Sequence, residues 1–485
     1  MGNQNKFSRD DTEYKEKEMS GSIEKDTAFL NEKLKIGINF DLLYRDILVG
    51  QKQSSMYFID GFCKDELMQK LLQLFMGITK EDMPEDVTAM LRQYVPYVEV
   101  STEKEWEKIV YNILCGVFAL FIDGFDACIL IDSRTYPART VTEPEKDKAL
   151  RGSKDGFVET VIFNTALIRR RIRSTDLRIE MLNAGVSSKT DIAICYMDSR
   201  VDHEFLDVVK RRINEIKVDA LTMNQESLAE CLYKRKWYNP FPKFKFTERP
   251  DTASAQVLEG SIVLLVDNSP SAMIAPTSIF DIVEEADDYY FPPITGSYLR
   301  LTRFFISILT YILTPTFLLF MQNPEWVPEA LAFIKVKETM NIPLLWQFLA
   351  LEIAIDGLRL AAINTPSMLS TPLSVMAALV LGEFSVKSGW FNAEVMLYMA
   401  FVAIANYTQA NYELGYAIKF MRIITLILTA CFGVWGYITG ILILITAIAT
   451  NRTVSKKSYI YPLLPFNLKQ LCKRLFRLRL PESKE

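Results

Sequence analysis

Residues 299–321 read LRLTRFFISILTYILTPTFLLFM, and this stretch decides the fold class of the second half of the chain. After its two arginines it holds about twenty apolar or small residues, enough at about 1.5 Å per residue for a helix to cross roughly 30 Å of hydrocarbon. A spanning helix is therefore predicted here. The chain of 485 residues is also apolar as a whole, because 49% of its residues are hydrophobic and its mean hydropathy is +0.10.

Further apolar stretches follow that helix. They lie at 344–363, 372–387, 393–410 and 415–449. The last is long enough for one tilted helix, or for two shorter helices broken near Gly433, Gly436 and Gly440. We therefore predict an all-α polytopic membrane domain at 298–450.

The charge of the carboxyl tail indicates the orientation of these helices. Residues 451–485 form a basic tail that contains Arg452, Lys456, Lys457, Lys469, Lys473, Arg474, Arg477 and Arg479. Cations that flank membrane helices prefer the cytoplasmic side, and the amino end lacks the apolar run of a signal peptide. Both termini are thus predicted to be cytoplasmic. That requires an even number of crossings, either four, with 344–363 partly in the membrane plane, or six.

The first part of the chain has a different character. Up to about residue 297 no apolar run is long enough to cross a bilayer, and helical and strand periodicities alternate. We predict a disordered charged head at 1–26, a first cytoplasmic lobe at 27–145, a second lobe at 146–240, and a linker with a hairpin at 241–297. The fold class is then a two-lobed cytoplasmic domain of α+β or α/β type followed by membrane helices.

Two segments have the pattern of a β-hairpin. GVFALFIDGFDACILIDSRTY (116–136) places apolar runs on both sides of Asp123-Gly124, a dipeptide typical of tight turns. GSIVLLVDN (260–268) resembles the start of that segment, so a second hairpin is expected there. A similarity this short is also what two unrelated hairpins would share.

The composition excludes several classes of function. The chain has 55 Lys and Arg against 59 Asp and Glu, so the basic surface of a general nucleic-acid binder is missing. A single histidine, His203, rules out sites that need two imidazoles. The seven cysteines form no C-x-x-C pair, and no phosphate-binding loop, dinucleotide fingerprint or nucleophile elbow is present. We expect no enzyme, no metal site and no cofactor.

The segment LLWQFLALEIAIDGLRLAAI (344–363) carries Glu352, Asp356 and Arg359. Spacings of four and three put them on one helical face, so Arg359 can pair with Asp356, and Glu352 then needs a second cation, a shared proton or water. Each ionised group costs roughly 2.5–3.5 kcal/mol at the bilayer centre. The face therefore either borders a wet path or a subunit interface, or forms a structural ion-pair network that locks helix packing.

A short segment, TPLSVMAALVLGEFSVKSG (371–389), carries small and weakly polar residues at helical spacing. These pore candidates are Ser374, Ala377, Ala378, Leu381 and Ser385. Such a stripe lines a pore if several copies form a ring. Close packing between membrane helices favours the same residue types.

Two basic segments have more than one interpretation. RRRIR (169–173) ends a predicted helix; a solvated basic face is the simplest interpretation, and an acidic partner or lipid head groups are the alternatives. FNLKQLCKRLFRL (466–478) alternates leucines with cations, which suits an interfacial amphipathic helix on anionic lipid or a plain basic flank.

Several motifs occur in the order found in one family. RTYPARTVTEPEKDKALRGSKDGFVETVIFNTALIRRRIR, AGVSSKTDIAICYMD, FTERPDTASAQVLEGSIVLLVDNSPSAMIAP, DDYY and LEIAIDGLRLA follow one another between residues 134 and 361. Over roughly residues 50–465 the chain resembles the GerA-type A subunits of spore germination receptors, and among them the SpoVAF branch.

The resemblance implies a multi-pass protein of the cell membrane or inner spore membrane that acts in spore germination. It further implies a homo-oligomeric, ring-shaped ion channel whose partners are other integral membrane germination proteins and membrane lipids. Glu352, Asp356 and Arg359 match the family's charged helix, and 371–389 matches its short helix of small residues. Two alternatives stay open: a secondary transporter in which Glu352 and Asp356 bind protons or cations, and a membrane scaffold that does not conduct.

Overall fold

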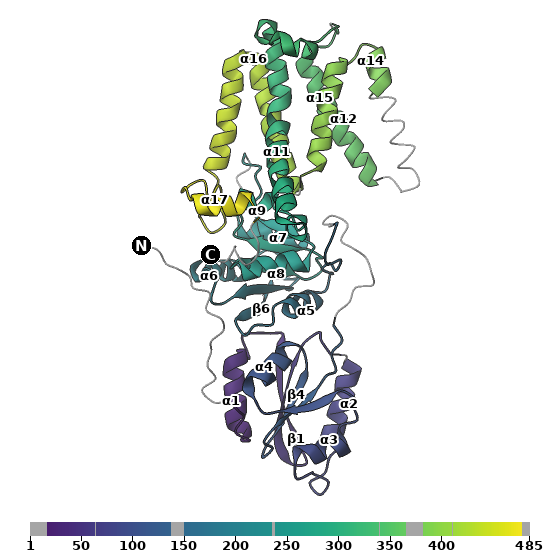
Figure 1. Ribbon diagram of the computed structural model, residues 1–485, viewed down its shortest axis with the longest axis vertical. Helices are drawn as coiled ribbons and strands as arrows, with labels where there is room; N and C mark the ends of the chain where they lie inside the picture. The colour runs from purple at the N-terminus through teal and green to yellow at the C-terminus, as the bar shows by residue number, and fades with distance from the viewer. Residues whose placement is uncertain are drawn as a thin grey trace. The chain divides into compact units, whose positions relative to one another are not determined.

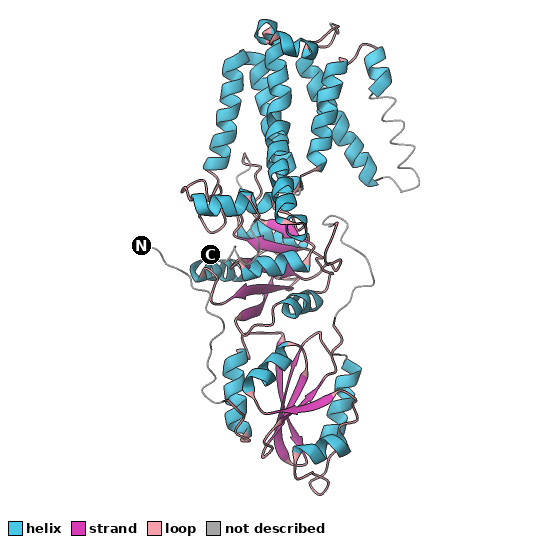
Figure 2. Cartoon of the chain, in the orientation of Figure 1, coloured by secondary structure: helices cyan, strands magenta, loops and turns pink. Residues whose placement is uncertain are grey.

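The computed structural model describes residues 17–63, 65–136, 150–234, 238–338, 340–364, 382–409 and 411–477. The chain divides into two compact units (Figure 1). The α/β unit comprises Met1–Lys148, Ser153–Lys234 and Phe246–Ala275, and the helical unit comprises Ala149–Gly152, Arg235–Lys245 and Pro276–Glu485. Strands lie in the first unit and long helices in the second, as the sequence predicts (Figure 2).

The first lobe of the α/β unit is a five-stranded antiparallel sheet with helices on both faces. Its elements are α1 (Ile23–Leu34), β1 (Leu42–Val49), β2 (Lys52–Ile59), α2 (Asp65–Met76), α3 (Val87–Tyr94), β3 (Val100–Glu103), α4 (Trp106–Leu114), β4 (Phe118–Ile122) and β5 (Cys128–Ile131). The strand order is β1-β2-β4-β5-β3. Alternate side chains of a strand point to opposite faces, so Phe121 packs with α1 and α4 while Phe118 packs with α2 and α3.

The second lobe repeats this plan. Its elements are α5 (Val161–Arg171), β6 (Leu177–Ala184), β7 (Thr190–Met197), α6 (His203–Asn214), α7 (Asn224–Leu232), β8 (Lys245–Thr247), α8 (Pro250–Leu258), β9 (Ile262–Val266) and β10 (Ala272–Ala275). The strand order is β6-β7-β9-β10-β8, which is the order of the first lobe.

The two lobes are structural repeats down to single hydrogen bonds. Helix α4 and strands β4 and β5 begin 144 residues before α8, β9 and β10, and α1 and α2 begin 138 residues before α5 and α6. In each lobe an aspartate directly after the fourth strand accepts the N–H of the first residue of the first helix. Asp123 accepts from Ile23 at 3.2 Å, and Asp267 accepts from Val161 at 3.1 Å. The similarity between residues 116–124 and 260–268 therefore marks equivalent strands of two repeats.

The lobe boundaries differ from those predicted in two places. The hairpin placed in the linker is part of the second sheet, because β9 pairs with β7 and Ile194 lies opposite Leu264. Local periodicity identifies a strand but not the sheet that it joins. At the amino end, α1 begins inside the predicted disordered head, where Asp26 accepts the N–H groups of Ser20 and Gly21 at 2.9 and 3.1 Å.

The structure contradicts a solvated basic face for Arg169 and Arg171, whereas Arg170 and Arg173 are exposed, as that interpretation expects. Arg169 is completely buried, and its Nε and Nη2 donate to the carboxylate of Asp41 at 2.7 and 3.1 Å. Arg171 Nη2 donates to both carboxylate oxygens of Asp155, at 2.7 and 2.6 Å. Asp41 lies in the first lobe and Arg169 in the second. The ion pair of Arg169 with Asp41 thus joins the two lobes.

The helical unit contains α9 (Ile279–Val283), α10 (Asp287–Tyr290), α11 (Pro293–Gln322), the 3-10 turns η1 (Pro324–Trp326) and η2 (Glu329–Ile334), α12 (Leu344–Asn364), α14 (Ser385–Lys387), α15 (Ala393–Tyr407), α16 (Tyr412–Ala449) and α17 (Leu468–Leu475). Two of its helices, α11 and α16, are long and apolar enough to cross a membrane, and α15 is apolar but shorter. Helices α11, α12, α15 and α16 pack against one another.

Helix α16 is broken into two arms that fold back on each other. The break is at Gly433, whose φ of 56° and ψ of −130° lie outside the helical region. A Cβ at Gly436 would lie 1.9 Å from the carbonyl oxygen of Leu428, and one at Gly440 would lie 2.5 Å from Thr425 Oγ1. Residues eight and fifteen positions apart touch only if the chain reverses. The 415–449 stretch therefore forms two shorter helices, and glycines allow their close approach.

Helices α12 and α15 begin at the same end of the unit. Gln347 Nε2 donates to Asn392 Oδ1 at 2.8 Å, and the Asn392 N–H donates to Gln347 Oε1 at 2.9 Å. Just inside these ends, Phe348 and Val395 share one apolar cluster. The two helices thus run in the same direction.

Candidate functional site

The charged helix α12 meets two cations from the first arm of α16. Arg422 Nε donates to Glu352 Oε1 at 3.0 Å, and Lys419 Nζ lies 3.3 Å from Glu352 Oε2. Lys419 also forms an ion pair with Asp356. The Arg422 side chain is completely buried and that of Glu352 is 4% exposed. These four residues form a neutral group, which we call the α12–α16 charge cluster.

Arg359 has other neighbours than the sequence indicates. Its guanidinium carbon lies 5.1 Å from the ring centroid of Tyr407 and 5.5 Å from that of Tyr416. Among the residues that the structure describes, the cation that contacts Asp356 is Lys419. The predicted pairing of Arg359 with Asp356 is therefore replaced by a cation–π contact, because a lysine on the neighbouring helix reaches the carboxylate.

Lys419 and Arg422 are the site residues that reasoning from sequence missed. They stand three positions apart in an otherwise apolar stretch, and Glu352 and Asp356 stand four apart in another. Each spacing puts its two groups on one helical face. Two charged faces of opposite sign, each too costly to leave in lipid alone, are the signal that could have identified the pairing.

The α12–α16 charge cluster lies near the middle of its helices. Arg422 stands ten residues from Tyr412 and ten from Phe432, the ends of the first arm. About 15 Å of helix therefore lies on either side of it, half of the roughly 30 Å of a bilayer core. In a helix that spans a bilayer, charges at the midpoint are the most costly to leave unpaired.

Hydroxyl groups of α11 and α16 extend the polar contacts beyond the charges. Arg422 Nη1 donates to the carbonyl of Thr310 at 3.1 Å, and the hydroxyls of Tyr311 and Thr425 lie 2.7 Å apart. The buried hydroxyls of Thr310 and Thr314 have no hydrogen-bond partner among the described residues. A polar seam therefore links α11 to the cluster, and α11, α12 and α16 meet at one place.

The pore candidates fall mostly outside the described residues. Ser374, Ala377, Ala378 and Leu381 lie in the segment 365–381, which the structure does not describe. Ser385 is the first residue of α14, and its hydroxyl donates to the carbonyl of Gly382 at 3.1 Å. The stripe of small residues at 371–389 stays a prediction.

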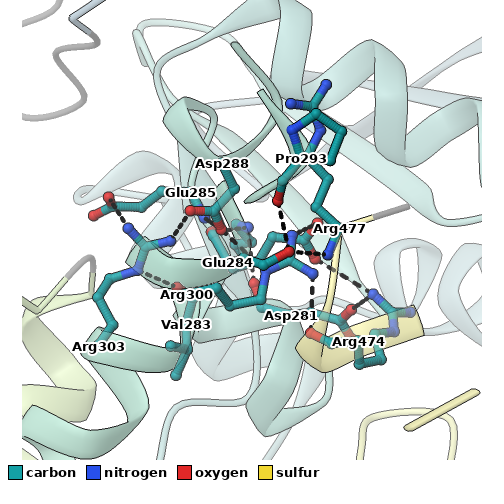
Figure 3. A network of polar contacts seen from close by, with 12 residues as sticks. Asp281, Val283, Glu284, Glu285, Asp288, Pro293, Arg300, Arg303, Arg474 and Arg477 are labelled. Atoms are coloured by element: carbon teal, nitrogen blue, oxygen red, sulfur yellow. Dashed lines mark hydrogen bonds and ion pairs between the residues drawn. The ribbon is translucent and has the colours of Figure 1, made fainter. Parts of the chain in front are cut away.

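A second group of buried charges lies at the start of α11, and we call it the α10–α11 charge cluster. Figure 3 shows Arg300 and Arg303 pointing toward the acidic residues that precede this helix. Arg300 donates from Nε to Asp288 Oδ2 and from Nη2 to Glu284 Oε1, both at 3.1 Å. Arg303 pairs with Asp288 and with Glu285, the latter at 2.8 Å. Asp288 is completely buried, so the entry to α11 is held by compensated charges.

The carboxyl-terminal helix α17 joins the α10–α11 charge cluster. Arg474 forms ion pairs with Asp281 and, at 3.4 Å, with Glu284. In return, Arg300 Nη1 donates to the carbonyl of Arg474 at 2.9 Å. Residues from the two ends of the helical unit's sequence thus share one network.

His203 and Cys128 have the surroundings of structural residues and not of reactive ones. His203 is largely exposed, and its Nε2 lies 3.0 Å from the carbonyl of Asp198. Burial raises the pKa of the Cys128 thiol far above its ordinary value of 9.0, so it stays protonated and is a poor nucleophile. Over the described ranges, no three His, Cys, Asp or Glu side chains are grouped to hold a metal ion.

Comparison with known proteins gives a family match and several similar relatives. Residues 28–485 match the family described as Bacillus/Clostridium GerA spore germination protein. Stage V sporulation protein AF of Bacillus subtilis (strain 168) is 35% identical over 462 residues, which cover 95% of this chain and 93% of that relative. Spore germination protein KA of the same organism is 27% identical, with 95% and 85% covered.

A solved structure is also similar to part of the chain. It is the crystal structure of the N-terminal domain of the A subunit of the Bacillus megaterium spore germinant receptor GerK3, with 23% identity and a TM-score of 0.41. The match covers 53% of this chain and 96% of that one. The family match spans both units and nearly the whole length, and the chain therefore belongs to the GerA family of spore germination proteins.

Proposed function

We propose that the chain is a membrane subunit that acts in bacterial spore germination and that several copies together surround an ion-conducting path. Membership of the GerA family, and relatives named for germination and sporulation, support the role in germination. The two helices with the length and composition of membrane spans, and a relative described as a membrane protein, support the location.

The proposed topology has six crossings with both termini cytoplasmic. Helices α11, α12 and α15 and the two arms of α16 supply five of them. We propose the apolar stretch predicted at 372–387 as the sixth, because α12 and α15 begin at the same end. An even number of crossings puts the basic tail on the same side as the amino end, in agreement with the positive-inside preference. The stretch 372–387 lies within 371–389 and contains the pore candidates.

The observation that favours a path between copies over a path through a single chain is the neutrality of the α12–α16 charge cluster. Glu352 is paired with Arg422 and Lys419, and Asp356 with Lys419. A secondary transporter needs charged groups that exchange partners with substrate or coupling ion, whereas these four satisfy one another at mid-helix. They are better suited to hold α11, α12 and α16 in fixed positions. The ion path is then assigned to the surface between copies, along the small residues of 371–389.

Ion flux tests this assignment. Potassium efflux and depolarisation are measured in cells that express the full chain, with Ala378 replaced by Trp or Leu381 replaced by Lys. A bulky or charged side chain in a narrow path should reduce or abolish the flux. Leu360→Trp is the control, because Leu360 is exposed on α12 and the change enlarges only a surface side chain. Unchanged flux in both stripe variants at normal protein levels would count against the pore.

A membrane scaffold that does not conduct is the second candidate. The same ion pairs favour it, since buried charge networks commonly fix helix packing. It predicts no flux from the chain at any protein level, together with co-purification of other integral membrane germination proteins. Subunit counting after mild detergent extraction separates the two, because a path between copies requires several copies and a single-copy particle excludes it.

A further inference from the structure

Helix α17 lies across one end of the helical unit and does not run alongside the long helices (Figure 1). Its inner side is fixed by the ion pairs of Arg474 with Asp281 and Glu284. Just beyond its end, the N–H of Arg477 donates to Ser297 Oγ at 2.9 Å. The helix is therefore held in one rotational orientation against the start of α11.

The outer side of α17 is an apolar stripe bordered by lysines. Leu468 and Cys472 are exposed and stand at i and i+4, so they follow one line along the helix, and the exposed Phe476 comes directly after its last residue, Leu475. Lys469 and Lys473 stand one position later and form a parallel line about 100° away. An apolar line beside a basic one is the pattern of helices that lie in the head-group region of a membrane.

The loop before α17 extends this surface. Its large exposed apolar side chains are Tyr461, Leu463, Leu464 and Phe466. Phe466 is 66% exposed and Leu468, which follows the loop, is 61% exposed. Isolated apolar side chains are normal on a protein surface, but a run of them within one short segment marks an interaction surface.

The charge and the position of residues 451–477 identify the kind of partner that this surface binds. Residues 451–477 contain seven Lys and Arg and no Asp or Glu, and although Arg474 is paired with Asp281 and Glu284, the positive charge of the segment favours an anionic surface. The segment also begins directly after the second arm of α16, which ends at Ala449. If that arm spans a membrane, the nearest apolar phase for the exposed stripe is the bilayer itself.

We propose that residues 461–477 form an interfacial anchor that binds the surface of an anionic lipid bilayer. Leu468, Cys472 and Phe476 insert at the boundary between head groups and acyl chains, and Lys469 and Lys473 contact lipid phosphates. The inference rests on the proposed membrane location of the helical unit and is independent of ion conduction. Because Arg474 ties α17 to the segment before α11, the anchor holds that segment at the membrane surface.

Fluorescence quenching in lipid nanodiscs tests the anchor with the full chain. Cys63, Cys231 and Cys431 are replaced by Ser, and an environment-sensitive label is attached to Cys472. The discs contain either phosphatidylcholine alone or a mixture with phosphatidylglycerol, and spin-labelled lipids serve as quenchers at known depth. We expect blue-shifted emission and strong quenching by shallow acyl labels, with more of both in the anionic discs.

Two label positions are the matched controls. Gln470→Cys, in a Cys472→Ser background, places the label about 160° around the helix from position 472 and should be quenched less. Ile308→Cys places it on an exposed position of α11 and should be quenched by deep labels. In addition, Lys469→Gln combined with Lys473→Gln should remove the preference for anionic discs.

The outcomes separate the anchor from the membrane assignment. A water-like signal from position 472 with a deeply quenched position 308 overturns the anchor and leaves the spanning helix in place. Water-like signals from both positions overturn the membrane location as well. Equal quenching in both lipid mixtures overturns the anionic preference. Protection of position 472 only after a partner protein is added assigns the stripe to that protein and overturns the anchor.

Discussion

Neutralising Glu352 is expected to destabilise the helical unit more than neutralising Arg422. In Glu352→Gln, Arg422 stays completely buried and loses the charge of the carboxylate that it contacts at 3.0 Å, so that among the described residues it retains neutral acceptors such as the carbonyl of Thr310. In Arg422→Gln, Glu352 still has Lys419 at 3.3 Å. The two sides of one ion pair are therefore not equivalent.

The magnitude follows from burial. Removing one partner of a buried pair costs about 3–5 kcal/mol, because the other charge stays in an apolar environment. We expect Glu352→Gln to lie within that range and Arg422→Gln to lie near or below its lower limit. The double variant contains neither buried charge, so its loss should fall short of the sum of the single losses by about 0.5–3 kcal/mol.

The assay is unfolding of the purified full chain by titration with sodium dodecyl sulfate in mixed micelles, followed by circular dichroism. Lys387→Gln is the matched control, because Lys387 pairs with Glu383 on a surface where both side chains are more than half exposed. Its effect should stay below about 1 kcal/mol. Additive losses in the double variant, or a Glu352→Gln variant as stable as the control, would refute the cluster as the structure presents it.

Three further predictions follow from contacts described above. Arg359→Ala should cost only about 0.5–2 kcal/mol in the same titration, because it removes a cation–π contact and leaves the carboxylates of α12 paired with cations of α16; a loss as large as that of Glu352→Gln would contradict this. Burial disfavours the charged form of Asp155, but hydrogen bonds from Arg171 and Ser153 outweigh it and hold the pKa of that carboxyl below its ordinary value of 3.8. The pair of Asp155 with Arg171 therefore stabilises the fold fully above pH 3.8 and loses its effect as the pH falls through the lowered pKa. The difference in thermal midpoint between wild type and Asp155→Asn should shrink below pH 3.8, and a difference that grows there would contradict the prediction. Gly436→Ala should prevent the two arms of α16 from packing closely, since its Cβ would lie 1.9 Å from a backbone oxygen. The Cβ of Gly357→Ala meets nothing within 4 Å, so this variant should stabilise α12 by up to about 1 kcal/mol. Protein level and unfolding midpoint are measured for both variants, and equal behaviour of the two would argue against the folded-back helix.

The elements that local patterns determine could be predicted from the sequence. The hairpin around Asp123-Gly124 follows from two apolar runs and a turn dipeptide. The glycines near residue 433 were compatible with either one long helix or two shorter helices at 415–449, and the structure has two. Apolar length alone identified the segments that form α11 and α16, which are long and apolar enough to cross a membrane. Each of these features depends on residues close together in the chain.

The pairing of charges could not be predicted in the same way. Arg169 pairs with Asp41, and Arg422 with Glu352, across separations of 128 and 70 residues. Helical spacing suggested a local partner for Arg359 instead, although a lysine on another helix pairs with Asp356. A spacing rule ranks only the partners within one element, and the tertiary fold decides among the rest.

The two lobes differ in the length of the connection that precedes their third strand. In the first lobe β3 begins at Val100, shortly after α3 ends at Tyr94, whereas in the second lobe β8 begins at Lys245 and α7 ends at Leu232. The additional residues coincide with Arg235–Lys245, which belongs to the helical unit, and there Phe241 is part of the apolar core. The longer connection therefore lets the second repeat supply residues to the core of the helical unit, which the short connection of the first repeat has no spare length to do.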